Sequence, residues 1–165
     1  MNCILAGVGG QGTVLASKLI AYTALAGNLH VRTAETIGMA QRGGCVISHV
    51  RTGKIIHSPL IPLGQADLII GFEPAEAVRC LPYLKKDGVV VVNKKAIRPV
   101  TASLSNREYD GTEMLLYLKE QVPGAIPVDG DSVCQTIGTA KVLNVVLLGA
   151  AIASGALAIT KEQME

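Results

Sequence analysis

The sequence predicts an α/β fold in a single domain of 165 residues, and two kinds of segment indicate it. A short apolar strand at 2–6 gives way to a glycine-rich turn at 7–12 and then to a helix at 13–26. Glycines in such a unit let the backbone turn tightly and approach a ligand closely. The GVVVVN run at 88–93 is apolar at consecutive positions, which is typical of a parallel strand with helices over both faces. We therefore expect a mainly parallel, Rossmann-like sheet flanked by helices, with an antiparallel hairpin addition.

The other elements follow from alternating hydrophobic periods along the chain. Further strands are expected at 29–34, 66–72 and 125–128. The antiparallel addition is expected as a hairpin of 45–52 with 54–57 about Gly53. Helices are expected from Pro74 to about 84, from the capping-box spacing at 110–113 to about 121, and as one long helix from about Ser132. Residues 94–109 show no clear hydrophobic period, so no helix or strand is assigned to them.

The C-terminal residues repeat a capping-box spacing at 160–163, but the chain stops two residues later. A helix that begins there has no room to form. We expect either that the natural chain extends further, as a truncated tail implies, or that this tail is disordered.

Composition argues against several classes of protein. The net charge is +2, with 17% charged and 3% aromatic residues, and the basic positions are scattered, so no nucleic-acid surface is expected. The cysteines are far apart and form no C-x-x-C pair, which indicates reduced thiols and no iron–sulfur or zinc site: Cys3, Cys45, Cys80 and Cys134. The MNCILAG start is too short and uncharged for a signal peptide. We expect a cytoplasmic protein.

The apolar run at 142–159 reaches the lower length limit of a membrane span. Glycine and alanine are frequent in it, and Gly149 and Gly155 interrupt it. We therefore favour a buried helix packed against the sheet or a partner, and expect no membrane contact.

A candidate site lies where the predicted parallel strands end, because ligands of open parallel sheets bind outside the carboxyl ends of the strands. Those ends bring together Gly9, Gly10, Gln11, Glu35, Glu73, Asn93 and Asp129. Glu35 is equally compatible with a ribose-binding acid of an NAD or FAD site and with a solvated residue at a strand end. Glu73, before Pro74, is favoured as a helix-terminus carboxylate over a catalytic base.

A second glycine cluster, Gly38-Met39-Ala40-Gln41-Arg42-Gly43-Gly44, makes a poor strand but a good exposed loop. Arg42 can hold a phosphate or carboxylate through two hydrogen bonds, or pair with an acidic group on another subunit. A plain surface turn is the remaining alternative.

The histidines and the polar residues of the expected long helix give little indication of catalysis. His49 is favoured as a structural histidine, and no Ser-His-Asp or Cys-His arrangement is indicated, so we assign no catalytic residue and no metal ligand. On the expected long helix, polar or small residues recur every three positions and must face water, a ligand or a partner: Gln135, Gly138, Lys141 and Asn144.

Five segments together resemble the gamma-type subunits of 2-oxoacid:ferredoxin oxidoreductases, the pyruvate/ketoisovalerate oxidoreductase gamma family, and within it the beta subunits of indolepyruvate ferredoxin oxidoreductases. They are GVGGQGT at 7–13, GMAQRGG at 38–44 with SHVR at 48–51, SPLIP at 58–62, FEP at 72–74 and KVLNVVLLGA at 141–150. The GVGGQG turn occurs in other folds, but joined to MAQRGG it is quite specific. Many relatives are expected to have His where this chain has Ile37, so the resemblance leaves the 2-oxoacid open.

The resemblance implies a subunit of an enzyme that oxidatively decarboxylates a 2-oxoacid with coenzyme A as co-substrate, forming acyl-CoA and reduced ferredoxin. It places thiamine diphosphate, magnesium and the iron–sulfur clusters on partner subunits. This chain agrees, because Gly130-Asp131-Ser132 lacks the rest of a thiamine-diphosphate motif. The positions expected to bind ligand or face the active site are Gly9, Gly10, Gln11, Gly12, Met39, Gln41, Arg42, Gly43, Gly44 and Glu73, and those expected to face a partner are Lys141 and Asn144.

The sequence is compatible with three functions. The first is a subunit without its own cofactor that completes the substrate or coenzyme A side of a 2-oxoacid:ferredoxin oxidoreductase, with self-association when it is isolated. The second is an autonomous NAD- or FAD-binding oxidoreductase. The third is a structural assembly subunit whose glycine loops only dock on the catalytic partner.

Overall fold

The computed structural model describes residues 1–38, 44–98, 109–157, 159 and 163. Within them, strands form one sheet in the order β2-β3-β1-β4-β5-β6. The strands are β1 (Asn2–Val8), β2 (His30–Ile37), β3 (Cys45–Gly53), β4 (Ala66–Gly71), β5 (Leu84–Asn93) and β6 (Ile126–Val128). The pairings β1–β4, β4–β5 and β5–β6 are parallel, which confirms the predicted mainly parallel α/β sheet.

The antiparallel part of the sheet differs from the prediction. β3 pairs antiparallel with β1 on one side and with β2 on the other. The expected hairpin of 45–52 with 54–57 is therefore wrong, and 54–57 is not a strand. The physical reason is that both edges of β3 are already occupied, so no free edge remains for 54–57. The hairpin is instead β2–β3, and the second glycine cluster lies in its connection.

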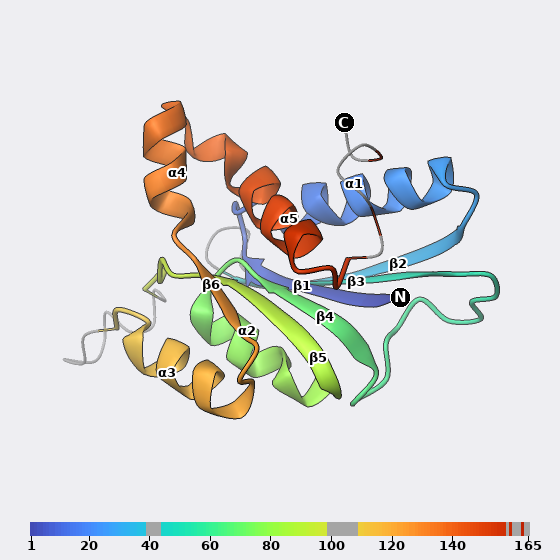
Figure 1. Ribbon diagram of the computed structural model, residues 1–165, viewed down its shortest axis with the longest axis horizontal. Coiled ribbons are helices and arrows are strands. Elements are labelled where there is room, and N and C mark those ends of the chain that lie inside the picture. Colours follow the sequence, from blue (N-terminus) through green and yellow to red (C-terminus); the bar gives the residue numbers. More distant parts are fainter. Residues whose placement is uncertain (39–43, 99–108, 158, 160–162, 164–165) are drawn as a thin grey trace.

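Helices cover both faces of the sheet, with α1 and α5 on one face and α2 and α3 on the other (Figure 1). The helical segments are α1 (Thr13–Ala26), α2 (Pro74–Cys80), α3 (Thr112–Gln121), α4 (Gly130–Ile137) and α5 (Leu143–Ala153), with single 3₁₀ turns at Leu81–Tyr83 and Ala140–Val142. On the α1/α5 face, Leu5, Ile20 and Leu147 belong to one buried cluster. On the other face, Ile4 and Leu118 belong to a second. Alternate residues of β1 thus fill both cores, as expected for a central strand.

Two predicted helices are interrupted. The helix expected to reach 84 ends at Cys80, and after a 3₁₀ turn that contains Pro82 the chain enters β5 at Leu84. Proline lacks the N–H that an α-helix interior needs. The long helix expected from Ser132 is also wrong, because Gly138 adopts a left-handed φ of 86° and ends α4. The residues predicted to form one polar stripe therefore lie on different segments.

α5 contains much of the apolar run. It ends at Ala153, and Leu147, Leu148 and Ala151 are buried against the sheet and α1, which confirms the predicted buried helix. Among the described residues, no helix has both the length and the apolar character needed to cross a membrane.

Two of the segments that carry the resemblance hold each other in place. Nη1 of Arg51 donates to the carbonyl oxygens of Ser58 and Leu60 at 2.9 and 3.1 Å. Nδ1 of the buried His49 accepts a hydrogen bond from the Ile61 N–H at 3.2 Å, and its ring meets Tyr83 edge-on. His49 is thus a structural residue, as predicted. Strand β3 fixes the irregular chain that leads to β4.

The His49 contact predicts a pH dependence of folding. Burial lowers the pKa of His49 below its usual 6.5, so the folded state binds this proton less readily than the unfolded state. The stabilisation is complete above pH 6.5 and is lost as the pH falls through the folded-state pKa, by about 1.4 kcal/mol per pKa unit of lowering. Urea unfolding between pH 8 and pH 5 measures this, and His49→Asn, which keeps an acceptor but does not titrate, should remove this part of the slope. An unchanged slope in the variant would contradict it.

Candidate functional site

The first glycine cluster forms the predicted turn between β1 and α1. Gly10 and Gly12 adopt φ of 99° and 83°, a region that other residues rarely enter. The Gly9 N–H donates to the Gly44 carbonyl oxygen at 2.8 Å, so the two glycine clusters meet at the end of the sheet. Met39, Gln41, Arg42 and Gly43 lie outside the described residues.

Gln11 links the ends of two strands on either side of the turn. Its Oε1 accepts from the Val8 N–H at 2.8 Å, and its Nε2 donates to the Phe72 carbonyl oxygen at 2.9 Å. The side chain also passes close to Gly7, where an added Cβ would lie 2.8 Å from Oε1. Gln11 was predicted to face a ligand. In the structure its oxygen and one of its N–H groups form hydrogen bonds within the chain, and these bonds hold the turn against the end of β4.

Asn93 makes a similar link at the end of β5. Its Nδ2 contacts the Phe72 carbonyl oxygen at 3.4 Å, and its Oδ1 accepts from the Gly130 N–H at 3.3 Å. Asp129, from the same predicted set, caps α4 by accepting from the Ser132 N–H at 3.1 Å. The polar groups at these strand ends thus join neighbouring elements as well as lining a site.

Glu73 is the N-cap of α2, which confirms the helix-terminus interpretation. It is 2% exposed, and Oε2 accepts from the Glu76 N–H at 3.1 Å while Oε1 accepts from the Tyr109 hydroxyl at 2.5 Å. Burial, and then the Glu73 carboxylate, raise the pKa of Tyr109 far above its usual value. Tyr109 stays a phenol, so it keeps donating to Glu73 and fastens the chain before α3 to the start of α2.

Glu35 does not occupy the position of a ribose-binding acid. It lies inside β2, and the antiparallel β3 separates β2 from the glycine turn after β1. Its Oε1 accepts from the Ser17 hydroxyl of α1 at 3.2 Å. The geometry therefore gives no support to the NAD or FAD site, because such a site needs the acid on the strand next to the turn.

A crevice of about 420 Å³ lies at the carboxyl ends of the strands. It is lined by Gly10, Gln11, Gly12, Leu15, Asn93, Lys95, Ile97, Asp131, Ala140, Lys141, Leu143 and Asn144. Of the strand-end residues predicted to share one crevice, Gly10, Gln11 and Asn93 line it, whereas Gly9, Glu35, Glu73 and Asp129 do not. Gly9 lines a neighbouring hollow of about 380 Å³ with Thr13 and Val46. Lys95 and Ile97 were not predicted to line the crevice. Their position just after the end of β5 could have indicated it.

The two residues predicted to face a partner separate in the structure. Lys141 is exposed beside the crevice. Asn144, which was also predicted to face a partner, is only 4% exposed and lies against Gly12 inside the chain. The break at Gly138 is the physical reason, because it turns α5 so that Asn144 faces the glycine turn.

The described residues do not fit the cofactors of the resembling family. Asp131 of the Gly130–Ser132 segment forms an ion pair with Lys95 at 2.7 Å, and no group of three or more potential metal-ligating side chains is found in the described part of the chain. Burial raises the pKa of Cys80 to about 12 and that of Cys45 to about 11, so neither side chain is a reactive thiolate in this chain.

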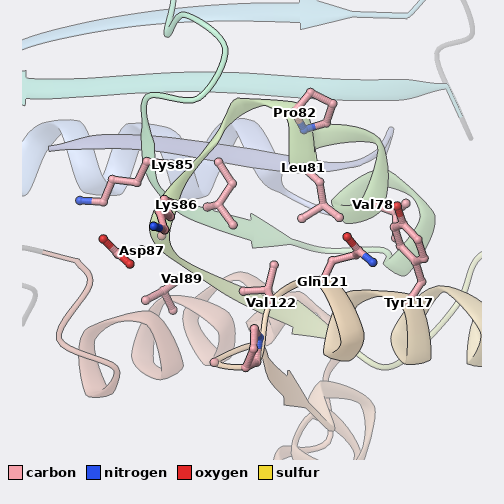
Figure 2. Close-up of a pocket in the computed structure, with 14 residues that line it drawn as sticks. Val78, Leu81, Pro82, Lys85, Lys86, Asp87, Val89, Tyr117, Gln121 and Val122 are labelled. Atoms are coloured by element: carbon pink, nitrogen blue, oxygen red, sulfur yellow. The ribbon is translucent and has the colours of Figure 1, made fainter.

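A larger cavity of about 710 Å³ lies at the opposite, amino end of β5 (Figure 2). Its walls include Val78, Leu81 and Tyr117, with Lys85 to Val89 along one side. Nζ of Lys85 pairs with Asp67 at 2.6 Å. This cavity shares no lining residue with the crevice, and no sequence motif pointed to it.

Comparison with known proteins agrees with the fold and the motifs. Residues 2–165 match the family model "Pyruvate ferredoxin/flavodoxin oxidoreductase". The chain is 41% identical, over 90% of its length and 74% of the relative's, to an indolepyruvate oxidoreductase subunit IorB of Archaeoglobus fulgidus.

Solved structures show the same fold. The chain resembles a keto/oxoacid ferredoxin oxidoreductase gamma subunit of Geobacter sulfurreducens with a TM-score of 0.66 at 20% identity, covering 99% of this chain and 81% of that one. It also resembles a 2-oxoglutarate:ferredoxin oxidoreductase of Magnetococcus marinus, solved with 2-oxoglutarate, coenzyme A and succinyl-CoA bound. There the TM-score is 0.65 at 20% identity, covering 95% of this chain and 25% of that one. The chain therefore belongs to the pyruvate ferredoxin/flavodoxin oxidoreductase family, as a small subunit of a 2-oxoacid:ferredoxin oxidoreductase.

Proposed function

We propose that this chain assembles with a larger catalytic subunit that carries thiamine diphosphate, magnesium and iron–sulfur clusters, and that the complex oxidises indolepyruvate or a related aryl 2-oxoacid. The bond between the carboxylate and the oxo carbon breaks and releases CO₂. The acyl group joins the sulfur of coenzyme A, the thiol proton is released, and a pair of ferredoxins takes up the electron pair. The named relative of Archaeoglobus fulgidus supports the choice of indolepyruvate. The free thiols favour the cytoplasm.

One observation carries the role of this subunit: the hydrogen bond from Gly9 to Gly44 joins both glycine clusters beside the crevice. Because glycines have no side chains, the backbone of the two clusters can lie this close and still leave space for a ligand or a partner loop at the strand ends. We place the coenzyme A side of the active site there. Arg42 belongs to the same connection and is proposed to face the substrate, coenzyme A or the partner.

The outer face of α1 and α5 supports a partner contact. Leu15, Tyr22 and Leu25 share one side of α1 with the exposed Lys18, and they are 53%, 69% and 53% exposed. On the neighbouring α5, Val145 is 58% exposed, and Leu143–Ala153 contains no charged residue. α5 is therefore apolar on both sides, and such a helix usually has both sides covered. We propose that the catalytic subunit covers this face, and that isolated copies self-associate through it.

Co-expression with the catalytic subunit tests the function. The isolated chain should show no oxidoreductase activity and no visible chromophore, because its described residues offer no cofactor site. The complex should oxidise indolepyruvate with coenzyme A and reduce ferredoxin or a viologen dye, and the catalytic subunit alone is the control. Turnover by this chain alone, or a brown preparation with stoichiometric iron and sulfide, would refute the proposal. Pyruvate, 2-oxoisovalerate and 2-oxoglutarate assayed in parallel test the choice of substrate.

A further inference from the structure

We infer that the outer edge of β2 is a docking site for an extended, acidic segment of another chain. The segment adds to the sheet as a further strand beside β2 and places carboxylates in a basic hollow next to that edge. The inference rests on the proposed function in one respect, since it assigns the segment to the catalytic subunit.

β2 is an outer strand of the sheet, with β3 along one side and no described strand along the other. It pairs with β3 over all of His30–Ile37 without a bulge, so the edge is long and regular. The strand contains no proline and no lysine, two residues that commonly protect an edge from pairing. An edge of this kind is a ready template for a strand of another chain.

Alternate residues of β2 direct their backbone groups outward. The Gly38 N–H donates to the Cys45 carbonyl oxygen at 2.8 Å, and these two residues are the next pair of the β2–β3 register. Hydrogen-bonded and non-hydrogen-bonded pairs alternate in an antiparallel ladder, so Val31, Thr33 and Glu35 point their N–H and C=O groups away from β3. No hydrogen bond joins these groups to another described residue. Another extended backbone presents donors and acceptors at the matching repeat.

A hollow of about 570 Å³ lies beside this edge, and its charged groups are all basic. Arg32 Nε donates to the Ile56 carbonyl oxygen at 2.9 Å, which holds the guanidinium group at the hollow. Lys54 is exposed there, and neither Arg32 nor Lys54 forms an ion pair with a described residue. The hollow is lined by His30, Val31, Arg32, Lys54, Ile55 and Ile56.

β3 adds a further cation on the same face of the sheet. Arg51 lies directly opposite Arg32 in the β2–β3 register, and like charges in that arrangement destabilise a sheet. The recorded acceptors of Arg51 are neutral: the carbonyl oxygens of Ser58 and Leu60 and Oδ1 of Asn2. Carboxylates of a docked segment offset this repulsion, so the charges favour an acidic ligand.

A second copy of β2 does not supply those carboxylates. In an antiparallel pair of β2 strands about a twofold axis, each residue keeps its face of the sheet. The copy therefore brings a second set of His30, Arg32, Ala34 and Thr36 to the face with the hollow, which adds an arginine and no acid. The catalytic subunit is the better owner of the segment. β2 contacts α1, whose outer side belongs to the proposed subunit contact (Figure 1).

Hydrogen exchange tests the added strand in the complex of the full chain with the co-expressed catalytic subunit. The outward amides of Val31, Thr33 and Glu35 should exchange quickly in the free chain. In the complex they should exchange at least about tenfold more slowly, because a strand pairs with them. The Ala34 amide, which already faces β3, should change much less. Equal exchange of the outward amides in the free chain and in the complex would overturn the inference.

Charge reversal tests the hollow. Lys54→Glu should weaken binding to the purified catalytic subunit by about tenfold at low ionic strength, and by less at high ionic strength, because it places a carboxylate among those of the segment. Lys119→Glu is the same reversal at an exposed position of α3, and it should leave binding within about twofold of wild type.

A proline tests the edge itself. Thr33→Pro should weaken binding by about tenfold, because it removes an outward N–H and leaves the hydrogen bonds to β3 in place. Thr33→Val, which keeps that N–H, is the control and should bind like wild type. Thermal melting identifies a variant that fails to fold, and Lys54→Glu, at an exposed position, then decides the matter.

The other outcomes are also distinct. Wild-type affinity of both Lys54→Glu and Thr33→Pro, in an active complex, would overturn the docking site and leave the proposed function intact. If Thr33→Pro abolishes only the self-association of the isolated chain, the occupant is a second copy and the inference is wrong. Retention of a single-stranded oligonucleotide that Lys54→Glu alone abolishes would assign the hollow to nucleic acid instead. A complex that forms through β2 but does not oxidise 2-oxoacids would refute the proposed function and support the docking site.

Discussion

Arg42→Ala is expected to impair the assembled enzyme by about a hundredfold and to change the melting temperature of the isolated subunit little. An arginine between Gln41 and two glycines has little packing to lose but a full charge to present. Removing one member of a buried charge pair costs about 2–5 kcal/mol, against about 0.5 kcal/mol for an ordinary surface substitution. Steady-state kinetics and complex formation measure the loss.

The property that changes in the Arg42→Ala variant identifies the group that Arg42 contacts. A raised KM for coenzyme A or for the 2-oxoacid identifies a ligand, and weaker complex formation identifies an acidic group of the partner. Lys119→Ala, which removes an exposed charge from α3, is the matched control and should affect none of them. If Arg42→Ala lowers the melting temperature steeply while the complex keeps its activity, Arg42 is a structural residue.

Gln11→Leu is expected to destabilise the subunit by about 2–4 kcal/mol, because it removes both side-chain hydrogen bonds by which Gln11 links the end of β1 to the residue after β4. The Val8 N–H would lose its acceptor, and the Phe72 carbonyl oxygen would keep only the long contact with Asn93 at 3.4 Å. A buried group left without a partner costs about 1–3 kcal/mol. Urea unfolding of the isolated chain measures the change.

Two further variants sharpen this test. Gln11→Glu keeps an acceptor for Val8 but cannot donate to Phe72 when ionised, so its cost should fall between those of wild type and Gln11→Leu. Gln135→Leu, at an exposed position of α4, is the control and should cost about 0.5 kcal/mol or less. Equal stability of Gln11→Leu and wild type would show that the turn does not depend on this side chain.

The elements that the sequence predicted well depend on local demands. Gly10 and Gly12 have the positive φ that the turn requires, and Pro74 follows the Glu73 cap at the start of α2. The consecutive apolar residues of β4 and β5 lie in the covered interior of the sheet, as their pattern indicates. These features could be predicted because each depends on a few neighbouring residues.

The wrong predictions concern residues whose partners are distant in the sequence. Asn144 fitted a polar stripe only if the helix continued through Gly138, yet a glycine inside a helical pattern can either be tolerated or end the helix. Likewise, 54–57 looked like a strand until β1 and β2 had occupied both edges of β3. Strand pairing is decided by which edges are free, and a local pattern does not contain that information.

The sequence by itself determined the α/β class, the glycine turn before α1 and the family, because backbone conformation and motif spacing are properties of short segments. Only the tertiary structure decided that Gly9 meets Gly44, that Gln11 bridges Val8 and Phe72, and that Asn144 points at Gly12. The residues of these contacts stand 35, 61 and 132 positions apart for Gly9–Gly44, Gln11–Phe72 and Gly12–Asn144. Such contacts form because the sheet order brings the strand ends together and the turn at Gly138 directs α5 back onto α1.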